Sequence, residues 1–264
     1  MPSYEPPVSQ LIELGQPHSS RNWAEYSQCG IGPEHVPELI RLLQDDELAR
    51  SNSESKVVFA QLHAWRALGQ LRAEAAIEPL LDLLDQIEDD ERWDDWTVAE
   101  VPIVLGMIGP AAFPATVARL KQSRRLENSP RCFSDVLKHL AERHPELRVD
   151  AVSVLASSLE NAAENHPSTN GSFIANLLDL NAVESWPVIE KAFATGNVDA
   201  WVAGDAAFVK WELGLGPRPT DTRVGGFFRA SPTPLPPTGP TAKDRAEKRA
   251  KQRKAEKRKS KRSR

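Results

Sequence analysis

Cysteine is scarce in this chain. Cys29 and Cys132 are the only two among 264 residues, they lie far apart, and no C-x-x-C pair occurs. This argues against a disulfide scaffold and against a cysteine-rich structural zinc site. We expect a reducing, cytoplasmic location, since residues 1–7 contain Glu5 and several prolines where a secretory signal needs a basic start and an apolar core.

Long apolar runs are also missing. Residues 101–118 carry no charge, but Gly109-Pro110 divides this stretch, and Pro102 and Pro114 lie inside it. Each half is too short to cross the roughly 30 Å of a bilayer core. The stretch therefore predicts two buried helices joined by a turn, and we expect no membrane partner.

No pattern typical of catalysis or cofactor binding is present. The sequence has no G-x-x-x-x-G-K-[ST] loop, no H-E-x-x-H pair and no strand-based G-x-G-x-x-G turn. We therefore expect a protein that is not an enzyme, with no cofactor and no metal. His139 and Glu142 offer two metal ligands on one helix, but without further ligands they are interpreted as solvated side chains. Cys132 would gain thiolate character at the start of that helix, or serve as a small buried apolar residue.

Helical periodicity recurs, whereas strand patterns are nearly absent. Apolar residues at 77, 80, 81, 84 and 87 follow one face of a helix, with Glu78, Asp82 and Asp85 on the other. β-Branched and aromatic residues never alternate over more than a few positions. The sequence predicts an all-α protein.

The helical segments repeat along the chain. Residues 35–43, 77–84, 113–120, 149–155 and 186–193 align with one another. Their equivalent positions, separated by 42, 35, 36 and 37 residues, are Pro37, Pro79, Pro114, Asp150 and Pro187. This is the period of a helix-turn-helix repeat, whose units bury a shared core by stacking.

Two of these units carry a recognisable motif. Residues 64–71 (AWRALGQL) followed by 76–84 (AIEPLLDLL) resemble the HEAT-like repeats named after phycobilisome lyases, and 105–110 with Phe113-Pro114 resemble a second copy. The resemblance covers residues 30–213, and the whole chain is similar to a bacterial family built from such repeats. It implies an α-solenoid that binds other proteins, but it implies no lyase activity. Some relatives end in a cysteine-rich zinc module, whereas this chain ends in lysine and arginine.

These observations predict a right-handed α-solenoid of about five HEAT-like helix pairs over residues 1–213. Residues 1–29 and 198–213 are expected to cap its two ends, the latter as a helix. Seven prolines between 217 and 240 predict an extended linker over 214–242. In that linker Phe227-Phe228 either docks on the solenoid or forms a short linear motif. Residues 243–264 are expected to form a disordered basic tail, because they contain no apolar residue larger than alanine.

The formal net charge of −4 combines two opposite parts. Residues 243–264 contain 13 Lys/Arg against 3 Asp/Glu, a balance of +10, so the remaining 20 Lys/Arg and 34 Asp/Glu leave residues 1–242 at −14. The tail either binds RNA or DNA phosphates or folds over the acidic body, while the absence of large apolar anchors disfavours a membrane. Its candidate nucleic-acid-binding residues are Lys248, Arg249, Lys251, Arg253, Lys254, Lys257, Arg258, Lys259, Lys261 and Arg262.

Residues 88–96 are the most unusual part of the body, with six carboxylates and two tryptophans. Tryptophans anchor many protein interfaces, and surrounding acids select a basic partner. Alternatively, the tryptophans pack between repeats and the acids are solvated. The candidate protein-binding residues are Glu88, Asp89, Trp93, Asp94, Asp95 and Trp96.

A further interaction is expected in the unit that matches the motif best. There Asp82 lies where it can reach Arg66 across the helix pair. We expect an ion pair, within or between repeats, that sets their stacking, with a ligand groove as the alternative.

We therefore expect a non-catalytic protein-protein interaction scaffold, monomeric, with a basic protein partner. Two alternatives stay open. One is an RNA- or ribonucleoprotein-associated protein tethered by the basic tail. The other is a lyase- or chaperone-like subunit that handles a tetrapyrrole-protein.

Overall fold

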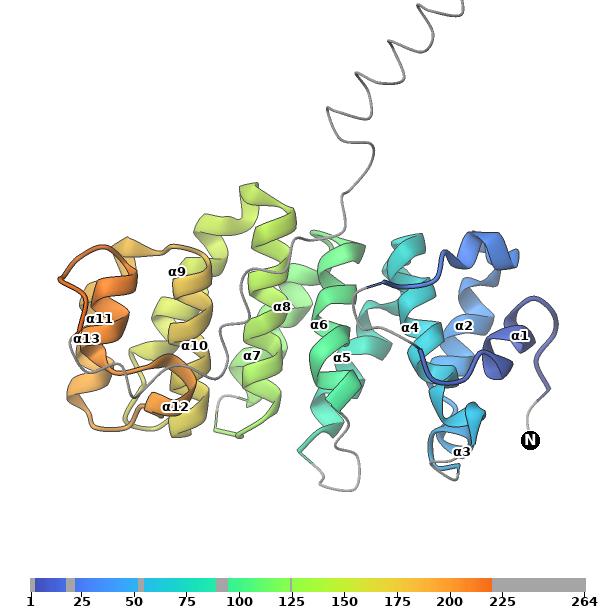
Figure 1. Ribbon diagram of the computed structural model, residues 1–264, viewed down its shortest axis with the longest axis horizontal. Helices are drawn as coiled ribbons and strands as arrows, with labels where there is room; N and C mark the ends of the chain where they lie inside the picture. The colour runs from blue at the N-terminus through green and yellow to red at the C-terminus, as the bar shows by residue number, and fades with distance from the viewer. Residues whose placement is uncertain (1–2, 18–21, 52–54, 89–94, 124, 220–264) are drawn as a thin grey trace, which may run out of the picture. The chain divides into compact units, whose positions relative to one another are not determined.

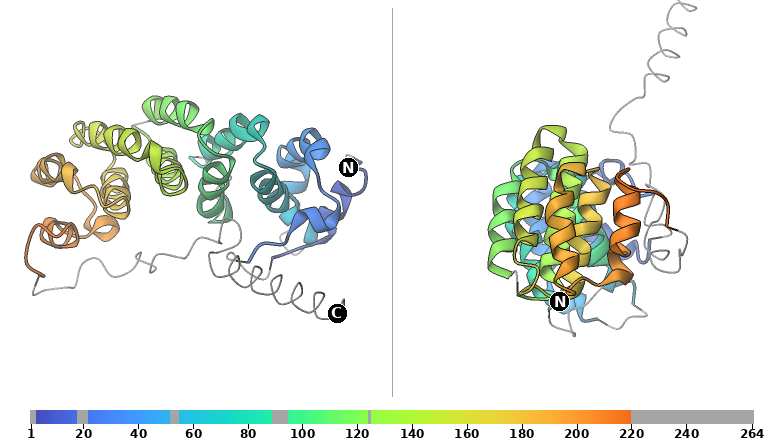
Figure 2. Two further views of the ribbon diagram at one scale, coloured as in Figure 1. Left: turned by 90° about the horizontal axis from the view of Figure 1, so that it is seen from above. Right: turned by 90° about the vertical axis from the view of Figure 1, so that its left-hand side faces the viewer.

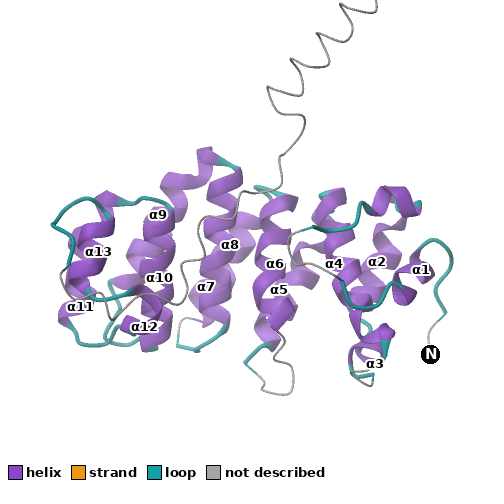
Figure 3. Cartoon of the chain, in the orientation of Figure 1, coloured by secondary structure: helices purple, strands orange, loops and turns teal. Residues whose placement is uncertain are grey.

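The computed structural model describes residues 3–17, 22–51, 55–88, 95–123 and 125–219. In these ranges the chain forms helices joined by turns and loops, and none of these residues lies in a strand (Figure 3). The chain divides after Phe228 into two units, and all described residues belong to the first. The prediction of an all-helical body is confirmed.

Two series of helices alternate along the sequence (Figure 1). The first series contains α4 (Ala60–Leu71), α6 (Asp95–Ile108), α8 (Ser129–Arg143) and α10 (Pro167–Asp179). The second contains α2 (Val36–Leu43), α5 (Ile77–Gln86), α7 (Ala112–Ser123), α9 (Arg148–Leu159) and α11 (Trp186–Ala194). Each helix of the first series packs on the next one of that series, while α5 packs on α7 and α9 packs on α11. Each unit thus adds one helix to either side of a shared core (Figure 2).

The remaining described elements are short. They are α1 (Val8–Glu13), η1 (Tyr26–Cys29), η2 (Pro33–His35), α3 (Asp46–Ala49), η3 (Lys56–Phe59), η4 (Glu74–Ala76), η6 (Pro145–Leu147), η7 (Val183–Ser185), α12 (Ala200–Ala203) and α13 (Ala206–Glu212). Single 3₁₀ turns precede four of the second-series helices, namely α2, α5, α9 and α11. They let the chain reverse direction within a few residues.

The aligned positions of the sequence all lie in the first turn of a second-series helix. Pro37, Pro79, Pro114 and Pro187 are there, where the N–H that proline lacks has no partner within the helix. Asp150 occupies the same place in α9, where its charge is favourable at the helix N-terminus. The five helices predicted from the alignment are confirmed as helices.

The uncharged stretch also folds as predicted. α6 and α7 are separated by Gly109, whose φ of 115° gives the turn that ends α6. The apolar face predicted for residues 77–87 is buried throughout, because it packs against both neighbouring helices.

Gly106 shows why the motif contains glycine at this position. A Cβ added there would come within 2.9 Å of the Cβ of His139 and 3.1 Å of the His139 backbone carbon on α8. The absence of a side chain at Gly106 therefore allows α6 and α8 to approach each other closely.

The expected helix over residues 198–213 is wrong as a single element. Gly204, with φ of 85°, separates α12 from α13. The side chain of Asp205 then accepts a hydrogen bond from the Phe208 N–H at 2.8 Å and caps the new helix. Residues 198–213 therefore form two short helices, because a positive φ and a strong N-cap interrupt the pattern.

Candidate protein-binding site

The acidic segment of residues 88–96, which we call the acidic linker, was predicted to bind a partner. It is described only at its two ends. Glu88, Asp95 and Trp96 lie in the described ranges, whereas Asp89, Trp93 and Asp94 lie outside them. Asp95 is exposed in the first turn of α6, and Trp96 is half-buried against the core. Trp96 thus matches the alternative in which the tryptophans pack between repeats.

Glu88 is used inside the fold. Its Oε1 accepts hydrogen bonds from the backbone N–H groups of Asn128 at 2.7 Å and Ser129 at 2.5 Å. These groups lie at the start of α8, whose N-cap residue Asn128 makes no side-chain cap. A carboxylate at this position satisfies free N–H groups and interacts favourably with the helix dipole. The residue predicted to meet a partner instead links the end of α5 to the start of α8.

The ion pair expected between Arg66 and Asp82 is wrong. Arg66 binds Glu100 on α6, with Nε 2.7 Å from Oε2 and Nη2 2.5 Å from Oε1. Only 1% of each residue is exposed, and the Trp65 indole N–H donates to the same carboxylate at 3.2 Å. Glu100 lies on α6, which packs against α4, the helix of Arg66. This packing explains why Arg66 pairs with Glu100 and not with Asp82 on α5.

Asp82 instead belongs to an acidic cluster on α5. Glu78 and Asp82 each lie 2.8 Å from Nη2 of Arg119 on α7, and Asp85 contacts Nη1 of the same guanidinium. Partial burial opposes the charge on Arg119, but the three carboxylates outweigh it and raise its pKa. One arginine thus links α5 to α7, and the acidic face predicted for α5 is partly neutralised.

A second buried polar group lies at the N-terminal end of α4. The Nε2 atom of His63 is 2.8 Å from the Gly15 carbonyl, and its Nδ1 atom is 2.7 Å from the Tyr26 hydroxyl. Since a carbonyl oxygen only accepts, Nε2 carries the proton and Nδ1 accepts from the hydroxyl. Burial lowers the pKa of His63, with the charge of Arg66 adding to the effect, so the ring is neutral and structural.

The thiolate character expected for Cys132 is wrong. Its side chain is buried, and burial raises the pKa of the thiol, with Asp135 adding to the effect. The dipole of α8 does not outweigh the loss of solvent. Cys132 is therefore the small buried apolar residue of the alternative interpretation.

His139 and Glu142 form a local pair. Nδ1 of His139 lies 3.0 Å from Oε2 of Glu142. Burial opposes the charge on Glu142, but the contact with His139 and the nearby cations outweigh it and lower the pKa of the carboxyl. Within the described ranges, no three His, Cys, Asp or Glu side chains come together in a way that could hold a metal ion.

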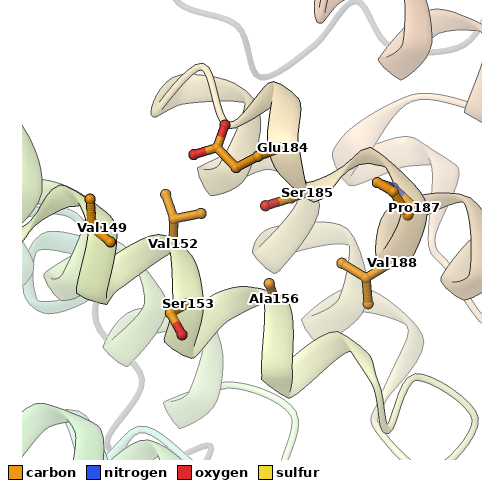
Figure 4. Close-up of a pocket in the computed structure, with 8 residues that line it drawn as sticks. All are labelled: Val149, Val152, Ser153, Ala156, Glu184, Ser185, Pro187 and Val188. Atoms are coloured by element: carbon orange, nitrogen blue, oxygen red, sulfur yellow. The ribbon is translucent and has the colours of Figure 1, made fainter.

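The structure brings together an apolar groove that sequence reasoning missed. It lies between α9 and α11, has a volume of about 380 Å³ and has a mainly apolar accessible lining (Figure 4). The residues that line it are Val149, Val152, Ser153, Ala156, Glu184, Ser185, Pro187 and Val188. We call this feature the α9–α11 groove. Its volume is near the lower end of the range of about 300–1,000 Å³ for ligand sites, so it fits a few side chains.

Val149 is an exposed valine in the lining of the groove. It is 73% exposed, although the alignment places it at the start of a segment of alternating apolar residues. The sequence signal was present, because residues 149–155 and 186–193 are the least regular copies of the repeat. Where the sequence departs from the aligned pattern, its side chains fill the space between the two helices less completely.

A single carboxylate gives the groove a charged rim. Nη1 of Arg148 lies 3.0 Å from Oε1 of Glu184, and the Arg148 guanidinium also donates to the carbonyls of Leu180 and Asn181. A hydrogen bond from its own backbone N–H and the contact with Arg148 lower the pKa of Glu184. Glu184 is therefore ionised at neutral pH with its charge offset by Arg148, and Asp150, which follows Val149 in the chain, is exposed.

The nucleic-acid-binding candidates of the tail, Lys248 to Arg262, all lie outside the described residues. Among the residues described, no helix has both the length and the apolar character needed to cross a bilayer.

Comparison with known proteins adds no further constraint. No protein-family model, curated protein or solved structure matches this chain. The function is therefore argued from the geometry of the described residues.

Proposed function

We propose that this chain is a right-handed α-solenoid of about five HEAT-like helix pairs that serves as a non-catalytic scaffold for protein-protein interactions. The alternation of the two helix series and the 35 to 42 residue spacing of equivalent positions support this architecture. So does the position of Gly106, which lets neighbouring units approach closely. The proposed location is the cytoplasm, and the proposed state is a monomer.

The observation that carries the binding role is the α9–α11 groove. It exposes Val149, next to the largely buried Val152 and opposite Val188. Apolar surface of this kind gains roughly 25 cal/mol for each Å² removed from water, so a partner that covers it is favoured. Because Glu184 and Asp150 lie beside it, the proposed partner segment combines apolar and basic residues.

The chemistry of the titratable side chains supports a binding role rather than catalysis. His63 and Cys132 are buried in uncharged form, and Arg66 and Glu100 neutralise each other within the core. These groups serve to hold helices in register.

Affinity capture with the full chain tests the proposal. The bait carries Val149→Asp, which places a charge in the groove, and the control carries Leu126→Asp, at an apolar residue that is 45% exposed away from it. We expect wild type and the control to retain the same proteins and Val149→Asp to lose a defined subset. Identical protein sets for all three baits would contradict a binding role for the groove.

The acidic linker supports a second docking surface on the same scaffold. Trp93 and Asp94 are the proposed contacts, since Glu88 is held at α8 and Trp96 packs on the core. We expect Trp93→Ala to remove part of the captured protein set while helical content, measured by circular dichroism, stays unchanged. An unchanged set would remove this surface from the proposal.

The charge of the tail favours one other candidate function, association with RNA. About ten excess cations give an affinity that falls steeply with salt and does not depend on base sequence. RNA retention should be compared across a salt series for the full chain and for a chain that ends at Pro240. Equal retention by both would exclude the tail as the RNA-binding segment.

A further inference from the structure

The α9–α11 groove shares α11 with the last described helix, α13, which packs against it. α13 packs against α11, and Lys210 near its end lies with Nζ 5.0 Å from the centre of the Trp186 ring. Trp186 is the first residue of α11 and precedes Pro187, which lines the groove. The chain therefore leaves α13 at the same end of α11 that forms the wall of the groove.

The path beyond α13 starts close to this position. Arg218 lies over the ring of Trp211, with its Cζ 5.2 Å from the ring centre, and the described chain ends at residue 219. Five further residues, from 219 to 224, span up to about 17 Å when extended. This exceeds the diameter of one helix, about 10–12 Å, so residue 224 can reach across α11.

The sequence after residue 219 contains apolar side chains next to a basic one, which suits an apolar groove with carboxylates at its rim. Between residues 220 and 264 the only aliphatic or aromatic side chains larger than alanine, proline aside, are Val224, Phe227, Phe228 and Leu235. Three of them fall in residues 223–228 (RVGGFF), which begin with a basic residue. Apolar side chains match the valines of the groove. Arg223 matches two exposed carboxylates, those of Glu184, which also contacts Arg148, and of Asp150.

We propose that residues 223–228 bind in the α9–α11 groove of the same chain and compete there with an outside partner of the same chemistry. Phe227 and Phe228 pack against Val149, Val152 and Val188, and Arg223 pairs with Glu184. This inference rests on the proposed role of the groove as a docking site, and it adds the kind of segment that the groove takes and a means of regulating access.

The attachment of residues 223–228 to the same chain determines how strongly they compete with a free peptide for the groove. A short flexible linker gives an effective concentration of about 1 mM, so a segment with a dissociation constant of about 100 μM occupies its site about nine-tenths of the time. A free peptide of the same sequence must displace it, and its apparent affinity for the wild-type chain falls about tenfold. Removing the tethered copy restores the full affinity.

A fluorescent peptide with the sequence of residues 222–230 (TRVGGFFRA) tests this in the full-length protein. We expect the Phe227→Ala/Phe228→Ala chain to bind the peptide about tenfold more tightly than the wild-type chain, measured by fluorescence anisotropy. Adding Val149→Asp to that double variant should abolish binding, whereas adding Leu126→Asp should leave it unchanged. Circular dichroism of each variant checks that the helices are retained.

Three results would overturn the inference. They are equal affinity for wild type and the double variant, binding that survives Val149→Asp, and no binding to any variant. A wild-type dimer that dissociates in the double variant would show docking between two copies and would also overturn it. The capture experiment with Val149→Asp is independent, because loss of captured proteins there upholds the proposed function even when the peptide fails to bind.

Discussion

Removing one charge from the buried Arg66–Glu100 pair should strongly destabilise the protein. Both side chains are about 1% exposed, and the guanidinium donates two hydrogen bonds to the carboxylate, at 2.5 and 2.7 Å. Glu100→Gln keeps the size of the side chain but removes the negative charge that pairs with Arg66 in the core. Breaking a buried pair in this way costs about 3–5 kcal/mol, a large share of the roughly 5–15 kcal/mol that stabilises a typical domain.

The pair also couples two helices, so a double-mutant cycle isolates its contribution. Arg66→Met removes the cation, and the combination with Glu100→Leu replaces both charges by apolar groups. We expect the double variant to lose at least 2 kcal/mol less than the sum of the two single losses, because neither charge is left unpaired. The aromatic rings of Trp23 and Trp96, 4.9 and 5.7 Å from the guanidinium carbon, remain in place to pack against the new side chains.

Urea unfolding followed by tryptophan fluorescence measures these losses, since Trp65 donates a hydrogen bond to the same carboxylate. The matched control is Arg125→Gln, at an ion pair of 3.5 Å in which the two side chains are 75% and 56% exposed. It should cost less than about 1 kcal/mol. A loss below about 1 kcal/mol for Glu100→Gln, or simple additivity in the cycle, would refute the assigned role of the pair.

Three further predictions follow from the other buried groups. Since the folded-state pKa of His63 lies below 6.5, stability should fall as the pH drops from 7 to 5, and His63→Gln should reduce that fall in urea unfolding; equal falls would contradict it. Glu88→Ala removes the cap of α8 and should cost about 0.5–2 kcal/mol in thermal unfolding, more than Asp150→Ala at an exposed residue in the first turn of α9. Iodoacetamide should alkylate Cys132 only after denaturation, as detected by mass spectrometry, and modification of the native protein at the rate of a free thiol would disprove its burial.

Much of the helical structure follows from local sequence. The apolar spacing at Ile77, Leu80 and Leu84 gives one buried face. Prolines such as Pro79 lie in the first turn of a helix, where the missing N–H costs no hydrogen bond. Gly109-Pro110 ends one helix and starts the next, as predicted. These features depend on residues within about one or two helical turns, which is why the sequence reveals them.

The partners of charged residues could not be predicted in the same way. The sequence indicates Asp82 as the partner of Arg66, yet the guanidinium binds Glu100, which lies on the helix that packs against α4. Glu88 similarly finds the free N–H groups of Asn128 and Ser129, 40 and 41 residues away in sequence. Such choices depend on which helices face each other, and a linear pattern does not contain that information.

The sequence by itself determined an all-helical body, the positions of the five aligned helices and the opposite charges of residues 1–242 and 243–264. Only the tertiary structure decided which ions are buried together and where apolar surface is left open. Val149 and Leu155 belong to one aligned segment, but packing buries Leu155 and leaves Val149 exposed in the α9–α11 groove. The physical reason is that periodicity assigns a residue to a helix face, whereas burial depends on how completely a neighbouring helix covers that face.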